Sequence, residues 1–134
     1  MDKSAGAYAE VHADITRMPW KWAKNNTADR IEVSNTAEHI ERYSWIRVVR
    51  ECHRVLKPGG ILFIKAPILT ADNLDAAFSD PTHVNFFTDH TFDYYDYRHL
   101  RWINYGKYYE IPPFERLQQA RRGRFIIATL KAVK

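Results

Sequence analysis

Apolar side chains between residues 45 and 56 recur at steps of three and four. This spacing places them on one face of a helix, with arginine and glutamate side chains on the opposite face. The apolar positions are Trp45, Val48, Val49, Cys52, Val55 and Leu56. Pro58 cannot continue such a helix, and Gly59-Gly60 can adopt the positive φ angles that reverse the chain. The pattern therefore predicts a helix over residues 38–57 with a sharp end.

A continuous apolar run, Ile61–Ile64, follows this turn. Such runs are typical of a parallel strand that is covered on both faces. Ile31–Ser34, before the helix, is expected to be another strand, as the family resemblance described below implies. With a second strand at 61–66, the three elements form a β-α-β unit whose crossover should be right-handed. This geometry places Asn35 and Ala66-Pro67 at one edge of the sheet, where open α/β sheets bind ligands.

Three further segments have the composition of strands. Tyr8–Ala13 alternates weakly between apolar and polar positions, whereas residues 1–7 are small and polar and are expected to be disordered. Arg101–Ile111 and Arg124–Val133 are aromatic or β-branched runs. The sequence therefore predicts one strand before the β-α-β unit and two strands after it.

The long connection at residues 68–90 is expected to be an ordered flap. Loops of this length are usually functional or disordered, and four apolar side chains favour order here. They are Leu74, Phe78, Phe86 and Phe87. Because the flap starts at the carboxyl end of a strand, it should fold over that edge and carry His83 with it. A helix with Thr88 as N-cap and Asp89 in its first turn is expected to follow and to carry Phe92 and Tyr95.

The composition is typical of one folded domain. The chain has 134 residues, of which 46% are hydrophobic and 14% aromatic, so one domain spanning residues 1–134 is expected to have a real core. A single cysteine, Cys52, cannot form an internal disulfide, which favours a cytoplasmic protein. Its place on the apolar stripe favours a buried thiol over a nucleophile. Neither a membrane span of roughly 20 apolar residues nor a signal peptide is expected.

The net charge of +4 is distributed unevenly. Residues 98–134 carry nine basic and two acidic side chains, whereas the first 97 residues carry eleven basic and fourteen acidic ones. A basic segment of this kind can bind an anionic partner such as nucleic acid, and Arg121, Arg122 and Arg124 are the residues that support this. A solvated basic face without any partner is the commoner outcome.

Residues 53–64, His-Arg-Val-Leu-Lys-Pro-Gly-Gly-Ile-Leu-Phe-Ile, resemble a segment of class I S-adenosylmethionine-dependent methyltransferases. In that family a helix end, Lys-Pro-Gly-Gly and the apolar fifth strand occur in this order. The alternative is a generic helix–strand connection in another doubly wound protein. The resemblance implies an α/β fold, a partial Rossmann-like methyltransferase domain with a mostly parallel sheet. Its antiparallel terminal pair, the sixth and seventh strands, would be residues 101–111 and 124–133.

The resemblance also implies which residues hold S-adenosylmethionine. In the family an acidic residue after the third strand accepts the adenine amino group, and its neighbour packs on the ring. Asp14 and Ile15 match this place, and Met18-Pro19-Trp20 resembles the Leu-Pro-Phe/Trp stretch that follows. An ordinary turn role for Asp14 is the alternative. Asn35 and Thr36, at the matching edge of the sheet, are expected to contribute to the same site.

The glycine-rich loop that holds the methionine part of the cofactor in this family has no counterpart before Asp14. The resemblance therefore covers nearly the whole chain but only the second half of the family's fold. A fragment of a longer protein, a degenerate relative and a piece completed by another chain are the open explanations. Because a half-sheet exposes a strand edge and apolar faces, a homo-oligomer or a complementing chain is expected.

Glu38 and His39 follow the strand edge, and His83 lies on the flap. Some ubiquinone-pathway O-methyltransferases and small-RNA 2′-O-methyltransferases have Glu-x-x-Glu-His here, which binds a divalent metal together with a later histidine. This chain has Asn35 in place of the first carboxylate. One oxygen and two imidazoles still suit manganese, iron or zinc better than magnesium. In other members Leu-Glu-His holds no metal, and Asp80-Pro81-Thr82-His83 would then be a plain turn with a hydrogen-bonded histidine.

The activity implied by the resemblance is methyl transfer from S-adenosylmethionine to an oxygen or nitrogen acceptor. Such a displacement depends on in-line positioning and on a base that takes the proton, for which His83 or His39 is the candidate. An inactive methyltransferase-like partner subunit is the alternative, and a basic nucleic-acid-binding module is a third hypothesis.

Overall fold

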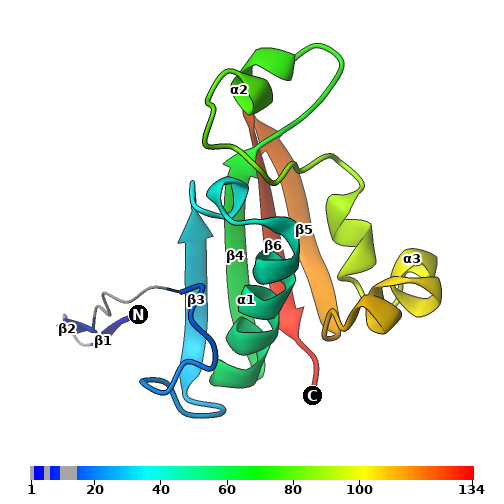
Figure 1. Ribbon diagram of the computed structural model, residues 1–134. Helices are drawn as coiled ribbons and strands as arrows, with labels where there is room; N and C mark the ends of the chain where they lie inside the picture. Colours follow the sequence, from blue (N-terminus) through cyan, green and yellow to red (C-terminus); the bar gives the residue numbers. More distant parts are fainter. Residues whose placement is uncertain (1, 5–6, 10–14) are drawn as a thin grey trace.

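The computed structural model describes residues 2–4, 7–9 and 15–134, and its main sheet has four strands. Their order is β3-β4-β6-β5, with β3 at Ala28–Ser34, β4 at Leu56–Pro67, β6 at Phe125–Ala132 and β5 at Phe114–Arg122 (Figure 1). The β3–β4 ladder is parallel, and the other two are antiparallel. The predicted α/β fold class with an antiparallel terminal pair is confirmed. Only one of the three ladders is parallel, because β6 itself pairs antiparallel with β4.

Helix α1 (Arg42–Val55) connects β3 to β4 and buries its apolar stripe against the sheet. Burial raises the pKa of the Cys52 thiol to about 12, as expected for a core thiol. The predicted start at residue 38 was wrong by four residues. The Glu41 carboxylate accepts hydrogen bonds from the amides of Tyr43 (2.9 Å) and Ser44 (3.2 Å), so it caps the helix there.

Strand β4 follows α1 without an intervening loop. The expected chain reversal at Gly59-Gly60 is a bulge, in which the register with β3 shifts between Leu56 and Ile61. Gly59 has φ +80°, a left-handed conformation that glycine adopts without strain. A Cβ on Gly60 would lie 3.0 Å from both the Leu56 side chain and the Lys57 carbonyl oxygen. The two glycines thus let the chain change direction in very little space.

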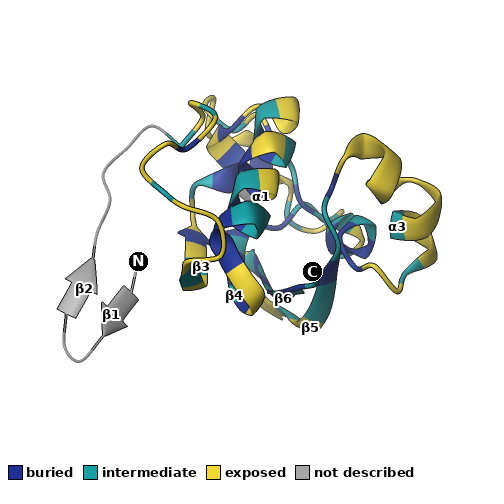
Figure 2. Cartoon of the chain, turned by 90° about the horizontal axis from the view of Figure 1, so that it is seen from below, coloured by how far each residue is buried: buried dark blue, intermediate teal, exposed yellow. Residues whose placement is uncertain are grey.

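The two faces of the sheet differ in how they are covered. Leu62, Ile64 and Ala66 are buried on the α1 side, whereas Ile61 and Phe63 are only half-buried on the other side. The prediction that 61–64 is covered on both faces was wrong for the described part of the chain, where the helices lie on one side (Figure 2). The uncovered side is called the outer face; its apolar residues are Ile61, Phe63, Phe125 and Ile127.

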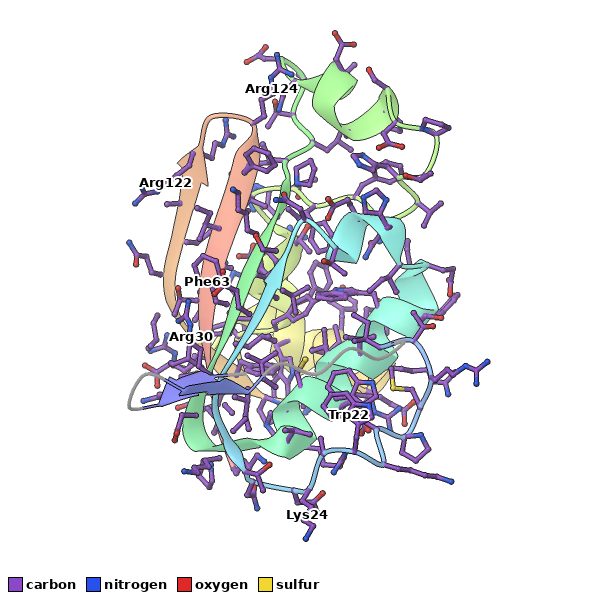
Figure 3. All side chains as sticks on the ribbon, turned by 90° about the vertical axis from the view of Figure 1, so that its left-hand side faces the viewer. Trp22, Lys24, Arg30, Phe63, Arg122 and Arg124 are labelled. Carbon is purple, nitrogen blue, oxygen red and sulfur yellow. The ribbon has the colours of Figure 1, made fainter. Side chains whose placement is uncertain are left out.

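Two cations partly cover the outer face. The Arg30 guanidinium lies 5.0 Å from the centroid of the Phe63 ring, and the Lys65 ammonium lies 4.5 Å from that of Phe125. Figure 3 shows Arg30 and Phe63 on the side of the sheet opposite α1. Contacts of this type shield apolar area while the charge stays hydrated.

The predicted strand at 101–111 was wrong. This segment holds helix α3 (Leu100–Asn104) and the 3-10 turn η3 (Gly106–Tyr109), and the strand is β5. The His99 side chain caps α3 by accepting a hydrogen bond from the amide of Arg101 at 3.0 Å. Strand β5 is an edge strand with many polar side chains, so it lacked the apolar run used to predict strands. The strand predicted at 124–133 is confirmed as β6.

The flap contains one short helix, α2 (Leu74–Phe78), and ends before the 3-10 turn η2 (Thr91–Tyr94). Among its four expected anchors only Phe87 is fully buried, whereas Leu74 is 50% and Phe78 57% exposed. The expected helix at Thr88 was wrong, because the Thr88 amide donates to the Thr91 hydroxyl (2.8 Å) and the helical turn starts later. Phe92 and Tyr95 are buried.

Near the amino terminus, β1 (Asp2–Ser4) pairs antiparallel with β2 (Ala7–Ala9). The expected disorder of residues 1–7 is therefore wrong for the part of it that belongs to these strands. Two residues separate the strands, so little loop entropy opposes the pairing. Residues 10–14, most of the strand expected at 8–13, lie outside the described residues. No described helix is long and apolar enough to cross a membrane.

The His53 ring joins α1 to the carboxyl-terminal hairpin. Its Nε2 lies 3.1 Å from the carbonyl oxygen of Pro113 and 3.0 Å from that of Val133, so a neutral ring donates its proton to them. The ring also packs edge-on against Phe114. Desolvation lowers the pKa of His53 below its usual 6.5.

We expect His53 to make the protein less stable in mild acid. Because the pKa of His53 is lower in the folded state, its contribution is complete above about pH 6.5 and is lost as pH falls below that value. In His53→Gln, the decrease in unfolding free energy between about pH 7.5 and 5.5 should be smaller than in the wild type. Urea denaturation at several pH values measures it, with His90→Gln, an exposed histidine, as control. An unchanged pH dependence in His53→Gln would contradict the assignment.

Candidate functional site

Strand β3 ends at Ser34, and the residues that follow lie at the carboxyl edge of the sheet. Asn35 has φ +54°, and its amide donates to the Lys65 carbonyl oxygen at 2.9 Å, which closes this edge against β4. The 3-10 turn η1 (Ala37–His39) then places Glu38 in the interior, with 3% of its surface exposed, and His39 beside it. The chain therefore turns at the edge where α/β sheets bind ligands.

The flap is tied to this turn through its main chain. The amides of Val84 and Asn85 donate to the Glu38 carbonyl oxygen at 2.9 and 3.1 Å, and the Asn85 side chain donates to the Ala37 carbonyl oxygen at 3.3 Å. His83 is thereby brought to His39, with ring centroids 4.8 Å apart. One possible ligand atom from each of Glu38, His39 and His83 lies within 4.8 Å of the others. The predicted meeting of these three residues is confirmed.

The hydrogen bonds of the two histidines fix which ring nitrogen carries the proton. His83 Nδ1 lies 3.0 Å from the Ala77 carbonyl oxygen, which can only accept, so this nitrogen is the donor. Thr82 Oγ1 lies 2.6 Å from Asp80 Oδ1 and 2.9 Å from His39 Nδ1. The Thr82 hydroxyl donates its one proton to the carboxylate and therefore accepts from His39 Nδ1. In the neutral rings both Nε2 atoms are then free to act as a ligand or a base.

Asp80 completes this arrangement. Its carboxylate accepts from the hydroxyl and the amide of Thr82, and these hydrogen bonds hold the pKa of Asp80 below its usual range. Its other oxygen lies 3.6 Å from His83 Nε2. The Asp80–Thr82–His39 chain resembles the outer hydrogen bonds that orient histidine ligands of metals.

The Glu38 carboxyl group is the least satisfied group of the site. Its Oε2 lies 3.7 Å from His39 Nε2, and its Oε1 is buried without a hydrogen-bond partner among the described residues. Leaving such an oxygen unpaired costs about 1–3 kcal/mol. A cation or a proton donor at this position would remove that cost.

Of the residues predicted to hold the cofactor, two lie together at the end of β3, and a third lies near α1. Asn35 and Thr36 lie directly before the turn that carries Glu38, and the Thr36 hydroxyl donates to the Ser34 carbonyl oxygen at 3.0 Å. Ile15 is half-buried, and its carbonyl oxygen accepts from the Trp20 indole at 2.9 Å. The Trp20 amide in turn donates to Glu51 Oε1 at 2.7 Å, so these bonds connect Ile15 to α1. Asp14 lies outside the described residues.

The sequence did not single out Asp80, Thr82 and Asn85 as members of the site. Asp-Pro-Thr-His carries a signal for the first two, because an Asp two residues before a Thr often forms an Asx turn. The Thr82 amide does donate to Asp80 Oδ1 at 2.9 Å. Asn85 gives no such signal, since its buried position depends on how the flap folds back.

The arginines that supported nucleic-acid binding lie at the turn of the β5–β6 hairpin, next to the carboxyl end of β4. Arg121 pairs with Asp89, whereas Arg122 and Arg124 are exposed and have no ion pair among the described residues (Figure 3). The pairing neutralises part of the cluster. Nucleic-acid binding stays a prediction.

Comparison with known proteins agrees with this fold. A family model described as a methyltransferase domain matches residues 2–64. The match covers just under half of the chain and agrees with the resemblance to class I S-adenosylmethionine-dependent methyltransferases. No curated protein matches the sequence.

Solved structures of methyltransferases share the fold at low sequence identity. One is a SAM-dependent methyltransferase from Archaeoglobus fulgidus, with 15% identity and a TM-score of 0.62 over 95% of this chain and 69% of that one. A second is the 1,6-didemethyltoxoflavin N1-methyltransferase of Burkholderia thailandensis with bound S-adenosylhomocysteine, with 11% identity and a TM-score of 0.61 over 92% and 50%.

A third is an O-methyltransferase family 2 protein from Planctomyces limnophilus in complex with apigenin, with 15% identity and a TM-score of 0.60 over 90% and 33%. The chain thus spans from a third to about two thirds of the length of these proteins.

We expect the proton positions in His39 and His83 to be measurable. Nitrogen NMR of the imidazoles at neutral pH should show both rings protonated at Nδ1, because both Nδ1 atoms have acceptors. Thr82→Val should remove the acceptor of His39 and shift only that ring toward the Nε2-protonated form. Thr129→Val, on the other side of the sheet, serves as control. Nε2 protonation of both rings in the wild type would contradict the hydrogen-bond assignment.

Proposed function

We propose that this chain is one part of a methyltransferase that transfers a methyl group from S-adenosylmethionine to an oxygen or nitrogen acceptor. The observation that carries the proposal is the convergence of Glu38, His39 and His83 at the carboxyl edge of β3 and β4. The match of residues 2–64 to a methyltransferase domain supports the reaction class, and the S-adenosylhomocysteine bound to the Burkholderia protein supports the cofactor. A cytoplasmic location is part of the proposal, because the chain has a single, buried cysteine.

The chemistry assigns a role to the free histidine nitrogens. In the transfer, the bond between sulfur and the methyl carbon breaks while the acceptor oxygen or nitrogen bonds to that carbon, and the acceptor proton must leave. His39 Nε2 or His83 Nε2 is the base, since Nδ1 of each ring is already a donor. Asp14, Ile15, Asn35 and Thr36 are this chain's share of the cofactor site.

We propose that a partner covers the part of the sheet that the described strands leave open. The chain has no glycine-rich loop before Asp14, and β3 is an end strand of the four-stranded sheet, with one edge unpaired among the described strands. On the outer face, the Phe63 and Phe125 rings are each covered only by the charged end of one side chain, Arg30 and Lys65 respectively. A complementing polypeptide or a second copy would cover both the edge and the outer face.

We also propose a divalent cation at Glu38, His39 and His83. The donor set of one carboxylate oxygen and two imidazole nitrogens fits manganese, iron or zinc, and the unpaired Glu38 Oε1 would gain a partner. Asn35, in place of a further carboxylate, makes the site weaker. A cation there would polarise and orient an acceptor hydroxyl. It would take the place of the histidine base, because it would occupy the Nε2 atoms of both rings.

We expect the isolated chain to bind S-adenosylmethionine weakly or not at all. Without the glycine loop, its own cofactor contacts are limited to residues near Asp14 and the Asn35–Thr36 edge. Titration calorimetry on the chain alone, and on the chain mixed with a polypeptide that carries the glycine loop and preceding strands, tests this. Micromolar binding by the chain alone would contradict the two-part site. An assembled pair that binds the cofactor without transferring methyl groups would identify an inactive partner subunit.

We expect the chain to associate through the outer face or the β3 edge. Light scattering at high micromolar concentration should give a mass above that of the 15.8 kDa monomer. Phe63→Glu should weaken an assembly that buries the outer face, because it places a charge in the apolar centre. Tyr43→Glu, at an exposed position on the α1 side, is the control. A monomer at all concentrations would contradict this expectation.

We expect His83→Ala to abolish binding of manganese or zinc and, in the assembled enzyme, methyl transfer. Calorimetry and thermal unfolding measured on the same variant distinguish a site residue from a structural one. Loss of metal binding with little change in melting temperature supports the site. A lower melting temperature with unchanged metal binding would show that His83 only stabilises the flap. His90→Ala, an exposed histidine away from the site, is the control.

A further inference from the structure

A cavity of about 470 Å³ lies between the first turns of α1, the end of the flap and the segment from η2 to Ile111. Figure 1 shows these segments on the side of the sheet that carries α1. None of Glu38, His39 and His83 lines it. Its volume lies within the range of small-molecule sites, roughly 300–1,000 Å³. The cavity is called the α1 cavity.

The walls of the α1 cavity are mostly aromatic. The apolar lining includes Trp45, Ile46, Phe86, Phe87, Tyr95 and Ile111. The Trp45 indole donates to the Tyr95 hydroxyl at 2.8 Å, and burial raises the pKa of Tyr95 to about 12, so this wall is neutral. Tyr94 and Tyr109, which also line the cavity, lie nearly parallel with centroids 6.4 Å apart. Flat aromatic walls favour a flat aromatic ligand.

Two arginines give the cavity a positive charge. Arg42 at the start of α1 and Arg101 on α3 both line the cavity, are exposed, and form no ion pair with any described carboxylate. Arg101 is positioned by Tyr94, whose hydroxyl accepts from its Nη1 at 3.1 Å. Glu41, beside Arg42, is occupied by the helix amides that it caps. No aspartate or glutamate is among the lining residues of the cavity.

Two acidic groups of the segments that form the cavity already have partners. Glu110 pairs with Arg50 at 3.7 Å, and the buried Asp93 pairs with Arg116 at 2.8 Å. His90, a further basic group of the lining, lies 3.3 Å from Asp93 through its Nδ1. The two arginines therefore remain the uncompensated charges of the cavity. A planar guanidinium pairs with a carboxylate through two parallel hydrogen bonds.

We propose that the α1 cavity binds a planar aromatic anion, such as an aromatic carboxylate, with its ring between the aromatic walls and its charge at Arg42 and Arg101. The buried Asn85, which ties the flap to η1, is also part of the lining. A ligand in the cavity therefore lies next to the segment that holds His83. The binding itself does not depend on the proposed methyl transfer.

The test uses the whole 134-residue chain and naphthoate as probe. Amide and indole NMR should show saturable binding, with shifts at Trp45, Arg42 and Arg101. Naphthamide, which has the same rings but no charge, should bind about tenfold more weakly because it cannot form charge-assisted hydrogen bonds. Equal affinity for the two probes, no saturation, or shifts confined to the outer face around Phe63 would overturn the proposal.

Variants locate the charge contacts. Arg42→Gln and Arg101→Gln should each weaken naphthoate binding about tenfold and leave naphthamide binding unchanged. Arg47→Gln, an exposed arginine of α1 that does not line the cavity, is the matched control and should bind as the wild type does. Circular dichroism confirms that each variant is folded. Equal weakening in Arg47→Gln would show a general charge effect and overturn the assignment.

Discussion

Burial of the apolar stripe of α1 against one face of the sheet is the constraint on which the rest of the structure depends. Five side chains of the helix are buried there, and burying a large apolar side chain contributes about 1.5–3 kcal/mol. Because α1 connects β3 to β4, its packing brings Asn35 and Pro67 to the same edge. The turn with Glu38 and the start of the flap are therefore fixed by core packing rather than by contacts within the site.

The same packing leaves the sheet covered on one side only. Buried and half-buried side chains alternate along β4, and its half-buried residues face away from α1. Arg30 and Lys65 lie over aromatic rings on that side, which lowers the apolar exposure but does not form a second layer. A sheet built with a parallel ladder is usually covered on both faces. The outer face and the edge of β3, which is unpaired among the described strands, are therefore the surfaces that the proposed partner would cover.

The sequence predicted the parts of the fold that depend on strong periodicity. The stripe of α1 and the strands β4 and β6 follow from side-chain patterns and local backbone preferences. The predicted helix end at residue 57 was wrong by two residues, because α1 ends at Val55 and Pro58 lies inside β4. Strand β5 was missed because an edge strand has solvated polar residues, and the tyrosines of 101–111 suggested a strand where His99 caps a helix. In the site, the meeting of His83 with Glu38 followed from topology. The part played by Asn85 depends on the path of the flap, which no local pattern determines.

The two interpretations of the Asp80–His83 segment are compatible. As a plain turn, it uses the Asp80 carboxylate, the Thr82 hydroxyl and Nδ1 of both histidines. As a site, it needs only the Nε2 atoms, which those hydrogen bonds leave free. Two parts of Glu38 differ in the same way: its carbonyl oxygen holds the flap, whereas its Oε1 has no hydrogen-bond partner within the described part of the chain. The hydrogen bonds that hold the turn therefore leave both Nε2 atoms and one Glu38 oxygen available for the proposed ligand. The turn alone does not need a buried oxygen without a partner, which costs free energy.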